Sequence, residues 1–284
     1  MIQSTPTGHA TDREVPARHA RSWQLVSALR LADADASRAD ALVIDLEDAV
    51  PAAEKASARR AALSFLQDRP AWVRVNDATS GQWEADLSAI GASPGLRGIM
   101  LAKAECAEQV SRTAAKLPSG VRIVALIESA LGLEASSEIA RQPATFRLAF
   151  GSGDFRRDTG MADDPIALAY PRSRLVVASA AAGLPGPIDG PALTDSPDAL
   201  LAATSASRAL GMTGKLVLRA AHAAQINEAL SPSQAELAWA RDTVGREGHG
   251  DAIDGSYLPT LARARALLSL ADELGEGRAL GDVT

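Results

Sequence analysis

The sequence has almost no cysteine, which limits both its covalent and its metal chemistry. Its one cysteine, Cys106, excludes an intramolecular disulfide and a metal cage built from cysteine thiolates. Within "AECAEQV" we expect Cys106 to be a small, partly buried thiol near a helix start, in the reducing environment of the cytoplasm. The chain must therefore obtain its stability and any metal site from other residues.

An excess of basic charge and long apolar runs are also missing. The chain has 29 Lys and Arg against 35 Asp and Glu, and the arginines form no stripe that could follow a phosphate backbone. No run approaches the ~20 apolar residues of a membrane span, and residues 1–20 lack the apolar segment of a secretion signal. We expect no nucleic-acid or membrane partner, and a flexible N-terminal tail over residues 1–20.

Short apolar runs that favour strands alternate with alanine-rich segments of helical period. Eight runs are expected to be strands: Trp23–Val26, Ala41–Leu46, Ala71–Val75, Gly98–Leu101, Arg122–Ile127, Arg147–Phe150, Pro187–Ile188 and Lys215–Leu218. Segments such as "AAEKASARRAALSFL" place apolar residues three and four apart, as helices covering a sheet do. This alternation predicts an α/β fold, a (β/α)8 TIM barrel over residues 21–230. A doubly wound sheet is the alternative, but "GSGDFR" lacks the third glycine of a dinucleotide loop and no P-loop occurs.

The chain continues beyond the eighth unit as a C-terminal helical extension, residues 231–284. Ser231, Pro232 and Gln234 have the pattern of an N-cap, a first helical proline and a capping box, opening a helix through Val244. A last helix in "PTLARARALLSLADELG" follows a loop rich in Gly and Asp. We expect this pair to pack on its own barrel or on a neighbouring subunit.

Polar residues end several of the predicted strands, and barrel active sites lie at those strand ends. The candidates are Asp45, Glu47, Asp48, Arg74, Asn76, Lys103, Glu105, Glu128 and Asp154. Because the carboxyl ends of the strands meet at one mouth, we expect these side chains to converge. Glu128 and Asp154 come from successive strands and could hold a hard divalent cation such as Mg²⁺, leaving other positions to water and substrate.

Structural explanations exist for some of these residues. Asp48 could cap the helix that begins near Pro51. Lys103 could be an interior ion-pair partner for Asp45 or Glu47. Arg74 lies inside an apolar run, so it either pairs with a barrel acid or binds an anionic ligand.

Successive blocks of the sequence resemble the citrate lyase beta-subunit-like family. The blocks are "ADALVIDLEDAVPAAEKASARRA", "WVRVND", "GIMLAKAE", "ALIESALGL", "LAFGSGDFRRDTG", "RSRLVVASAAAGLPGPIDG" and "ALGMTGK", in order from about Arg21 to Gly255. This family is part of the Mg²⁺-dependent 2-oxo acid aldolases and acyl-CoA lyases, which are built on a phosphoenolpyruvate-type TIM barrel. The resemblance thus implies the same fold that the strand pattern predicts.

The resemblance also implies roles for the strand-end residues. It makes Glu128 and Asp154 the metal ligands, and it places the acids of "DLED" (Asp45, Glu47 and Asp48) around the metal site as catalytic residues. It implies that Arg74 binds the 2-oxo acid and offsets the negative charge that develops on it. Lys103 joins Arg74 and Glu128 as a substrate-binding candidate. The implied activity is a carbon–carbon lyase that cleaves or forms a citryl-CoA-like or malyl-CoA-like thioester through a metal-stabilised enolate.

The chain departs from the family's pattern near its C-terminus. Where thioester-cleaving members carry "DGxMID", whose last Asp moves a proton on the acetyl group, this chain reads "DGSYLP" with Pro259 in that place. Proline cannot carry a proton, so Asp251, Asp254 or His249 would have to supply it. After "GK" this chain has Leu218, Arg219, Ala220 and then His222 in place of Ile-His-Pro.

These departures leave several functions open. A lyase acting on an acyl-CoA is the first, and an aldolase on a free 2-oxo acid without coenzyme A is the alternative. A metal- and 2-oxo-acid-binding relative without turnover is a further possibility, and phosphoryl chemistry on phosphoenolpyruvate shares the barrel. The family also implies a homotrimer or homohexamer.

Overall fold

The computed structural model describes residues 15–36, 38–247 and 255–275. The chain forms two compact units, one comprising Ala20–Ser231 and the other Met1–His19 with Pro232–Thr284. Among the described residues, no helix is both long and apolar enough to cross a membrane.

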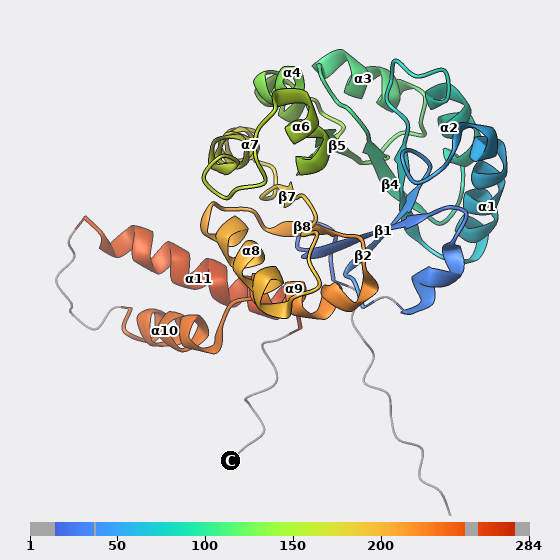
Figure 1. Ribbon diagram of the computed structural model, residues 1–284. Helices are drawn as coiled ribbons and strands as arrows, with labels where there is room; N and C mark the ends of the chain where they lie inside the picture. The colour runs from blue at the N-terminus through green and yellow to red at the C-terminus, as the bar shows by residue number, and fades with distance from the viewer. Residues whose placement is uncertain (1–14, 37, 248–254, 276–284) are drawn as a thin grey trace, which may run out of the picture. The chain divides into compact units, whose positions relative to one another are not determined.

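The larger unit is a closed barrel of eight parallel strands, in which each strand pairs with its neighbours in sequence and β8 pairs with β1 (Figure 1). The strands are β1 (Ser22–Ser27), β2 (Ala41–Asp45), β3 (Ala71–Val75), β4 (Leu96–Leu101), β5 (Ile123–Ile127), β6 (Thr145–Phe150), β7 (Ile188–Asp189) and β8 (Gly214–Val217). The predicted TIM barrel is confirmed. β7 is only two residues long, in keeping with the weak strand pattern of that segment.

Helices connect the strands and lie around the barrel (Figure 1). They are η1 (Leu31–Ala36), η2 (Ala52–Glu54), α1 (Lys55–Asp68), α2 (Trp83–Ile90), α3 (Ala107–Ala115), α4 (Ala130–Glu134), α5 (Ser136–Ala140), α6 (Ser152–Thr159), α7 (Ala169–Ala181), α8 (Pro197–Ala209), η3 (Ala220–His222) and α9 (Ala223–Leu230). Alternate strand residues such as Ile44, Val73 and Ile99 belong to the core cluster that also contains helix residues Ala58 and Ala62. This period of two leaves the other strand residues to fill the barrel interior.

The lower part of the barrel, where the strands begin, is filled by large side chains. The rings of Trp23 and Trp72 meet edge to face at 5.0 Å. Gly98 makes room for Trp72, because a Cβ at this glycine would lie 2.3 Å from the ring. The fully buried guanidinium of Arg147 donates to the carbonyl oxygens of Ala20 and Gly186 at 2.9 and 2.6 Å. These contacts close the barrel at this end.

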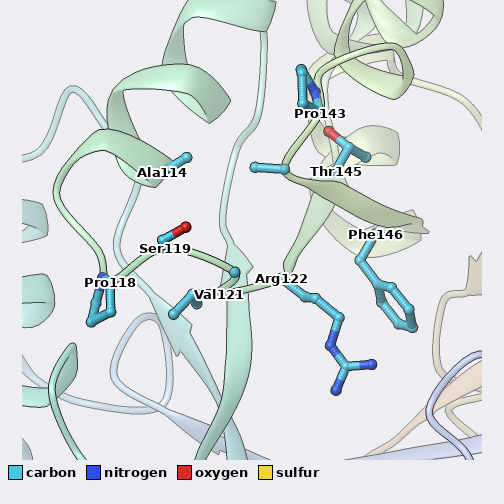
Figure 2. Close-up of a pocket in the computed structure, with 10 residues that line it drawn as sticks. Ala114, Pro118, Ser119, Val121, Arg122, Pro143, Thr145 and Phe146 are labelled. Carbon is cyan, nitrogen blue, oxygen red and sulfur yellow. The ribbon is translucent and has the colours of Figure 1, made fainter.

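An open pocket of about 420 Å³ lies near the beginnings of β5 and β6 (Figure 2). Its lining includes Arg122, whose guanidinium stacks over the rings of Phe146 and Trp72 at 4.8 and 5.5 Å. No carboxylate lines this pocket. The acidic residues predicted to carry the chemistry lie at the opposite ends of the strands.

The smaller unit contains the helical pair α10 (Gln234–Gly245) and α11 (Tyr257–Glu273). The predicted cap at Ser231 is wrong by two residues. The N-cap is Ser233, whose hydroxyl accepts from the backbone N–H of Glu236 at 3.2 Å while the Glu236 carboxylate accepts from the Ser233 N–H at 2.8 Å. The Ser231 hydroxyl instead donates to the carbonyl of Asn227 at 2.8 Å and so belongs to the end of α9.

Candidate active site

The carboxylate of Asp45 holds together the turn after β2 that carries Asp45, Glu47 and Asp48, the acidic turn. Asp45 accepts hydrogen bonds from the backbone N–H groups of Glu47 at 2.9 Å and Ala49 at 3.1 Å. Asp45 and Glu47 are 1% and 4% exposed, so the two acids that follow the buried strand are themselves buried. Asp48 is different, because its side chain is 59% exposed and its carboxylate lies 3.8 Å from the ammonium of Lys103. The capping alternative for Asp48 is wrong, since α1 begins without a side-chain cap.

Arg74 lies beside Asp45 in the register of β2 and β3. Its guanidinium binds the Asp45 carboxylate through Nε at 2.8 Å and a terminal nitrogen at 2.6 Å, and its other terminal nitrogen lies 3.1 Å from Glu47. Burial acts to raise the pKa of Asp45, but the hydrogen bonds and charge of Arg74 hold that pKa below its ordinary value. These contacts use one N–H on each nitrogen, which leaves a further N–H on both terminal nitrogens for a ligand.

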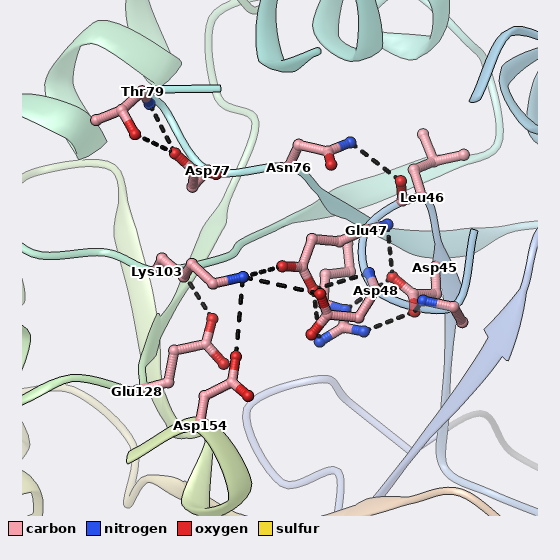
Figure 3. Close-up of polar contacts among 12 residues, drawn as sticks. Asp45, Leu46, Glu47, Asp48, Asn76, Asp77, Thr79, Lys103, Glu128 and Asp154 are labelled. Carbon is pink, nitrogen blue, oxygen red and sulfur yellow. Dashed lines mark hydrogen bonds and ion pairs between the residues drawn. The ribbon is translucent and has the colours of Figure 1, made fainter. Parts of the chain in front are cut away.

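Lys103 follows β4 in a left-handed backbone conformation, with φ of 47°. Its ammonium forms an ion pair with Glu47, which makes Glu47 and not Asp45 its partner, and it lies 3.8 Å from Asp154 (Figure 3). Burial acts to lower the pKa of Lys103, but the hydrogen bond and charge of Glu47 raise it above its ordinary value. Its backbone N–H donates to Glu128 at 2.8 Å, so this one residue contacts acids from three strand ends.

Glu128 ends β5 and is 5% exposed. Apart from the Lys103 N–H, no hydrogen bond to its carboxylate occurs within the part of the chain that the structure describes. Burial, followed by the negative charge of Glu47, raises the pKa of Glu128 to about 8. Such a shift indicates a carboxylate whose negative charge is insufficiently compensated by its neighbours.

Asp154 lies in the first turn of α6, directly after β6. One carboxylate oxygen pairs with Arg157 at 3.1 Å. The other oxygen, Oδ2, is buried and accepts no hydrogen bond. Figure 3 shows the Asp154 and Glu128 side chains together on the same side of Lys103.

The connected side chains carry an excess of negative charge. They comprise five carboxylates and three cations: Asp45, Glu47, Asp48, Glu128, Asp154, Arg74, Lys103 and Arg157. With all five carboxylates ionised, five negative and three positive charges leave two negative charges, the amount that a divalent cation balances; the raised pKa of Glu128 means that this carboxyl holds a proton at neutral pH unless a cation takes the proton's place. Asp154 Oδ2, whose one contact among the described residues is the Lys103 ammonium at 3.8 Å, and the poorly compensated Glu128 are oxygen donors of the type that Mg²⁺ prefers. No group of three or more His, Cys, Asp or Glu able to hold a metal occurs among the described residues, so a cation here would keep positions for water and substrate.

The structure brings together at one mouth Asp45, Glu47, Asp48, Arg74, Lys103, Glu128 and Asp154, whereas Asn76 binds Asp86 and Glu105 accepts from the Ser129 hydroxyl at 2.7 Å. It also adds residues that the sequence did not single out. Lys55, on α1, donates hydrogen bonds to the acidic turn, and Gly151 lies against the Glu128 side chain. A signal for Lys55 was present, because it shares the buried face of α1 with Ala58 and Ala62. A lysine on a stripe of small buried residues needs hydrogen-bond partners inside the protein.

The structure describes Cys106 but not the three residues proposed to carry the proton. Cys106 is the N-cap of α3, as a helix start predicts, but it is exposed, because an N-cap lies outside the helical turns that pack on the barrel. Asp251, Asp254 and His249 lie outside the described residues. Pro259 is in the first turn of α11, where a helix tolerates proline.

The segment after β8 also differs from the expected pattern. Arg219 forms an ion pair with Asp195, and His222 ends the short helix η3. Burial, followed by the positive charge of Arg219, lowers the pKa of His222. His222 is therefore more readily neutral than an exposed histidine.

Comparison with known families gives two matches that together cover most of the chain. Residues 24–220 match the HpcH/HpaI aldolase/citrate lyase family, and residues 235–275 match the HpcH/HpaI aldolase C-terminal domain. The first match spans all strand ends described above.

Individual relatives agree with this result. A citrate lyase subunit beta-like protein of Deinococcus radiodurans is 34% identical over 82% of this chain and 89% of its own. A (3S)-malyl-CoA thioesterase of Cereibacter sphaeroides is 31% identical over 82% and 86%, and the human mitochondrial citramalyl-CoA lyase is 28% identical over 84% and 80%. The solved structure of CitE from Mycobacterium tuberculosis, in complex with magnesium, acetoacetate and coenzyme A, is 27% identical with a TM-score of 0.74, and the match covers 90% of this chain and 99% of CitE.

Proposed function

The chain belongs to the HpcH/HpaI aldolase/citrate lyase family, and we propose that it is a Mg²⁺-dependent carbon–carbon lyase acting on a malyl-CoA-like or citryl-CoA-like thioester. The observation that carries this proposal is the pair Glu128 and Asp154, two buried or half-buried carboxylates in a site that holds more carboxylates than cations. The relatives include a citramalyl-CoA lyase and a magnesium complex, which support the choice of reaction and of metal.

In this proposal Glu128 and Asp154 are the ligands through which the protein holds the cation. When bound, Mg²⁺ would act as a Lewis acid on the carboxylate and the neighbouring oxygen of the 2-oxo acid half of the substrate, where it would offset the negative charge of that oxygen before the carbon–carbon bond breaks and leaves its electron pair on the acetyl thioester. The two unused N–H groups of Arg74 would bind the same acid and add positive charge where the negative charge grows. Asp45 fixes the guanidinium in place by its bidentate contact.

Lys103 and the acidic turn complete the proposed site. Glu47 lies between Arg74 and Lys103, so it sets the spacing of the two cationic side chains that face the substrate. Asp48 is exposed at the mouth, 3.8 Å from the Lys103 ammonium, and would bind water near the cation. Lys103 is 33% exposed and would contact the substrate from the side opposite Arg74.

Two features favour a second candidate, an aldolase on a free 2-oxo acid. Pro259 has no proton to transfer, and the loop after β8 lacks the family's usual residues. A free-acid aldolase needs no acid or base for an acetyl thioester at the position of Pro259. Thioester hydrolysis is a further alternative, because a (3S)-malyl-CoA thioesterase is among the relatives.

Isothermal titration of the purified protein tests the proposal, using oxaloacetate, pyruvate, acetyl-CoA and propionyl-CoA with and without Mg²⁺. We expect the 2-oxo acids to bind only with Mg²⁺ and the thioesters to bind as well. Binding of the acids without any thioester would favour the free-acid aldolase. Failure of both acids to bind in the presence of Mg²⁺ would refute the proposed site.

Product analysis then separates lyase from thioesterase. Malyl-CoA or citramalyl-CoA is incubated with the protein and Mg²⁺, and the products are separated by chromatography. Carbon–carbon cleavage releases acetyl-CoA with a 2-oxo acid, whereas hydrolysis releases free coenzyme A with the intact hydroxy acid. Release of coenzyme A alone would overturn the lyase assignment.

The assembly is also a proposal. We propose a homotrimer or homohexamer in the cytoplasm, with the C-terminal helical unit at a subunit interface, as the family resemblance implies. Sedimentation equilibrium of the full chain tests the subunit number, and a monomer at micromolar concentration would contradict it.

A further inference from the structure

Lys55 anchors the main chain on both sides of Glu47. Its ammonium donates to the carbonyl oxygens of Leu46 and Glu47, each at 2.7 Å, and to the side-chain oxygen of Asn76 at 2.9 Å. The Glu47 carboxylate makes separate contacts, with Arg74 and Lys103. Lys55 therefore fixes the backbone from which Glu47 reaches into the site without binding its carboxylate.

A second layer of contacts holds Asn76 in position. Its side-chain nitrogen donates to Leu46 at 3.0 Å and to Asp86 at 2.6 Å, and its backbone N–H donates to Asp86 at 3.0 Å. Asp86 also binds Arg59 at 2.7 Å. This network connects helices α1 and α2 with the ends of β2 and β3.

The hydrogen-bond partners of Lys55 are all neutral. The residue is 9% exposed, and burial lowers the pKa of its ammonium despite the negative charges of Asp86 and Glu47 nearby. A buried ammonium with all three N–H groups bonded resists replacement, because its loss removes one donor each from the carbonyls of Leu46 and Glu47. These carbonyls then keep the Asn76 amide at 3.0 Å and the Val50 N–H at 3.1 Å, respectively. A hydrophobic residue could fill the same volume, so packing alone does not require a lysine here.

We infer that Lys55 is a positioning residue that sets Glu47 between Arg74 and Lys103 for the reaction. The inference rests on the proposed function, because it gives Lys55 a role in catalysis by that site. Lys55 touches neither of the proposed metal ligands, which come from β5 and α6. Its loss should therefore slow the reaction while leaving the affinity for Mg²⁺ unchanged.

The test compares Lys55→Met with Lys215→Met. Lys215 is the other buried lysine among the described residues, and it pairs with Asp189 at 2.7 Å, away from the acidic turn. Both variants lose a buried ammonium, so both are expected to lower stability, but only Lys55→Met releases the turn. Lys55→Gln, which keeps one donor group, serves as the second variant if Lys55→Met does not fold.

Two quantities are measured on the folded full-length proteins: the Kd for Mg²⁺ by titration, and the Mg²⁺-dependent exchange of acetyl-CoA methyl protons for solvent deuterium by NMR, because a thioester lyase forms its enolate on the acetyl group. We expect exchange to fall about 10- to 100-fold in Lys55→Met, the usual loss when a supporting contact to a metal site is removed. Its Kd for Mg²⁺ should match wild type, and Lys215→Met should keep both values.

Each other outcome is informative. Equal exchange rates in Lys55→Met and Lys215→Met would show that Lys55 only stabilises the fold. A parallel loss of Mg²⁺ affinity in Lys55→Met would show that the effect spreads beyond Glu47, and it would also overturn the inference. Failure of the proposed function appears in the wild type itself, as an absence of Mg²⁺ binding and of Mg²⁺-dependent acetyl-CoA exchange, and would remove this role with it.

Discussion

Replacing Gly151 with alanine should disable the metal site through a single methyl group. A Cβ at Gly151 would lie 2.4 Å from a carboxylate oxygen of Glu128 and 2.5 Å from the Glu128 Cβ. The φ of Gly151 is −87°, so alanine meets no backbone penalty there. The effect of the substitution must then come from the collision with Glu128.

The collision cannot be relieved by a change of rotamer alone. Rotation would move the carboxylate, but the Glu128 Cβ is fixed to the main chain. The Gly151 backbone is also held, because its N–H donates to Ile127 at 2.9 Å and its carbonyl accepts from Phe155 at 3.0 Å. Ordinary contact begins near 3.4 Å, so the Cβ atoms at 2.5 Å must separate by about 0.9 Å. A misplacement of about 1 Å in a catalytic site can cost about 100-fold, or about 2.7 kcal/mol.

Gly153→Ala is the matched control, because it adds the same methyl group two residues later, where no atom lies within 4 Å. Titration with Mg²⁺ and pyruvate should show binding weakened about 100-fold in Gly151→Ala and unchanged in Gly153→Ala, with both proteins giving the circular dichroism of wild type. Equal binding in the two variants would refute the reasoning, since it would show that Glu128 can move without loss of the metal site.

Other substitutions test the remaining contacts. Glu128→Gln should abolish Mg²⁺-dependent binding of 2-oxo acids in titration while the barrel stays folded, and unchanged binding at saturating Mg²⁺ would remove the metal assignment. Arg74→Lys replaces a bidentate fork with a point charge. Urea unfolding should therefore show a free energy of unfolding lowered by about 1.5–3 kcal/mol, and titration should show weaker binding of the 2-oxo acid. Unchanged binding of the 2-oxo acid would show that Arg74 serves only as the partner of Asp45. Burial acts to raise the pKa of Asp189, but the charges and hydrogen bonds of Lys215 and Arg172 hold it below its ordinary value. This carboxylate therefore stabilises the fold at neutral pH, and the gain is lost as pH falls through the lowered pKa. Urea unfolding of Asp189→Asn should therefore show lower stability at neutral pH and a weaker decline toward acid pH than wild type.

The architecture was predictable because it depends on local patterns. Each of the eight strands is a short apolar run, and even the two-residue β7 was located by its place in the βα repeat. Parallel strands in a barrel carry their C-terminal ends to one mouth. The convergence of Asp45, Arg74, Lys103, Glu128 and Asp154 therefore follows from their positions at the ends of apolar runs.

The partners of these residues could not be read from the sequence in the same way. Asp45 and Arg74 are 29 residues apart, and Glu47 and Lys103 are 56 apart. Which acid pairs with which cation depends on strand register and side-chain direction. For the same reason the sequence left Lys103 with two possible partners and Asp48 with a capping role that it does not have.

Two local details were also wrong in the sequence analysis, each for a geometric reason. The pattern after α9 predicted a cap at Ser231, whereas the structure forms the capping box two residues later, between Ser233 and Glu236. Cys106 begins a helix as expected, but a helix start at the barrel mouth leaves its thiol exposed.

The sequence by itself determined the eight βα units, the strand-end positions of the polar residues and the family to which they belong, because periodicity and order along the chain carry this information. Only the tertiary structure decided how the charges are shared: Arg74 between Asp45 and Glu47, Lys103 on Glu47, and an excess of negative charge around Glu128. Those assignments depend on distances of a few ångströms between segments far apart in the chain, and such distances exist only once the barrel has closed.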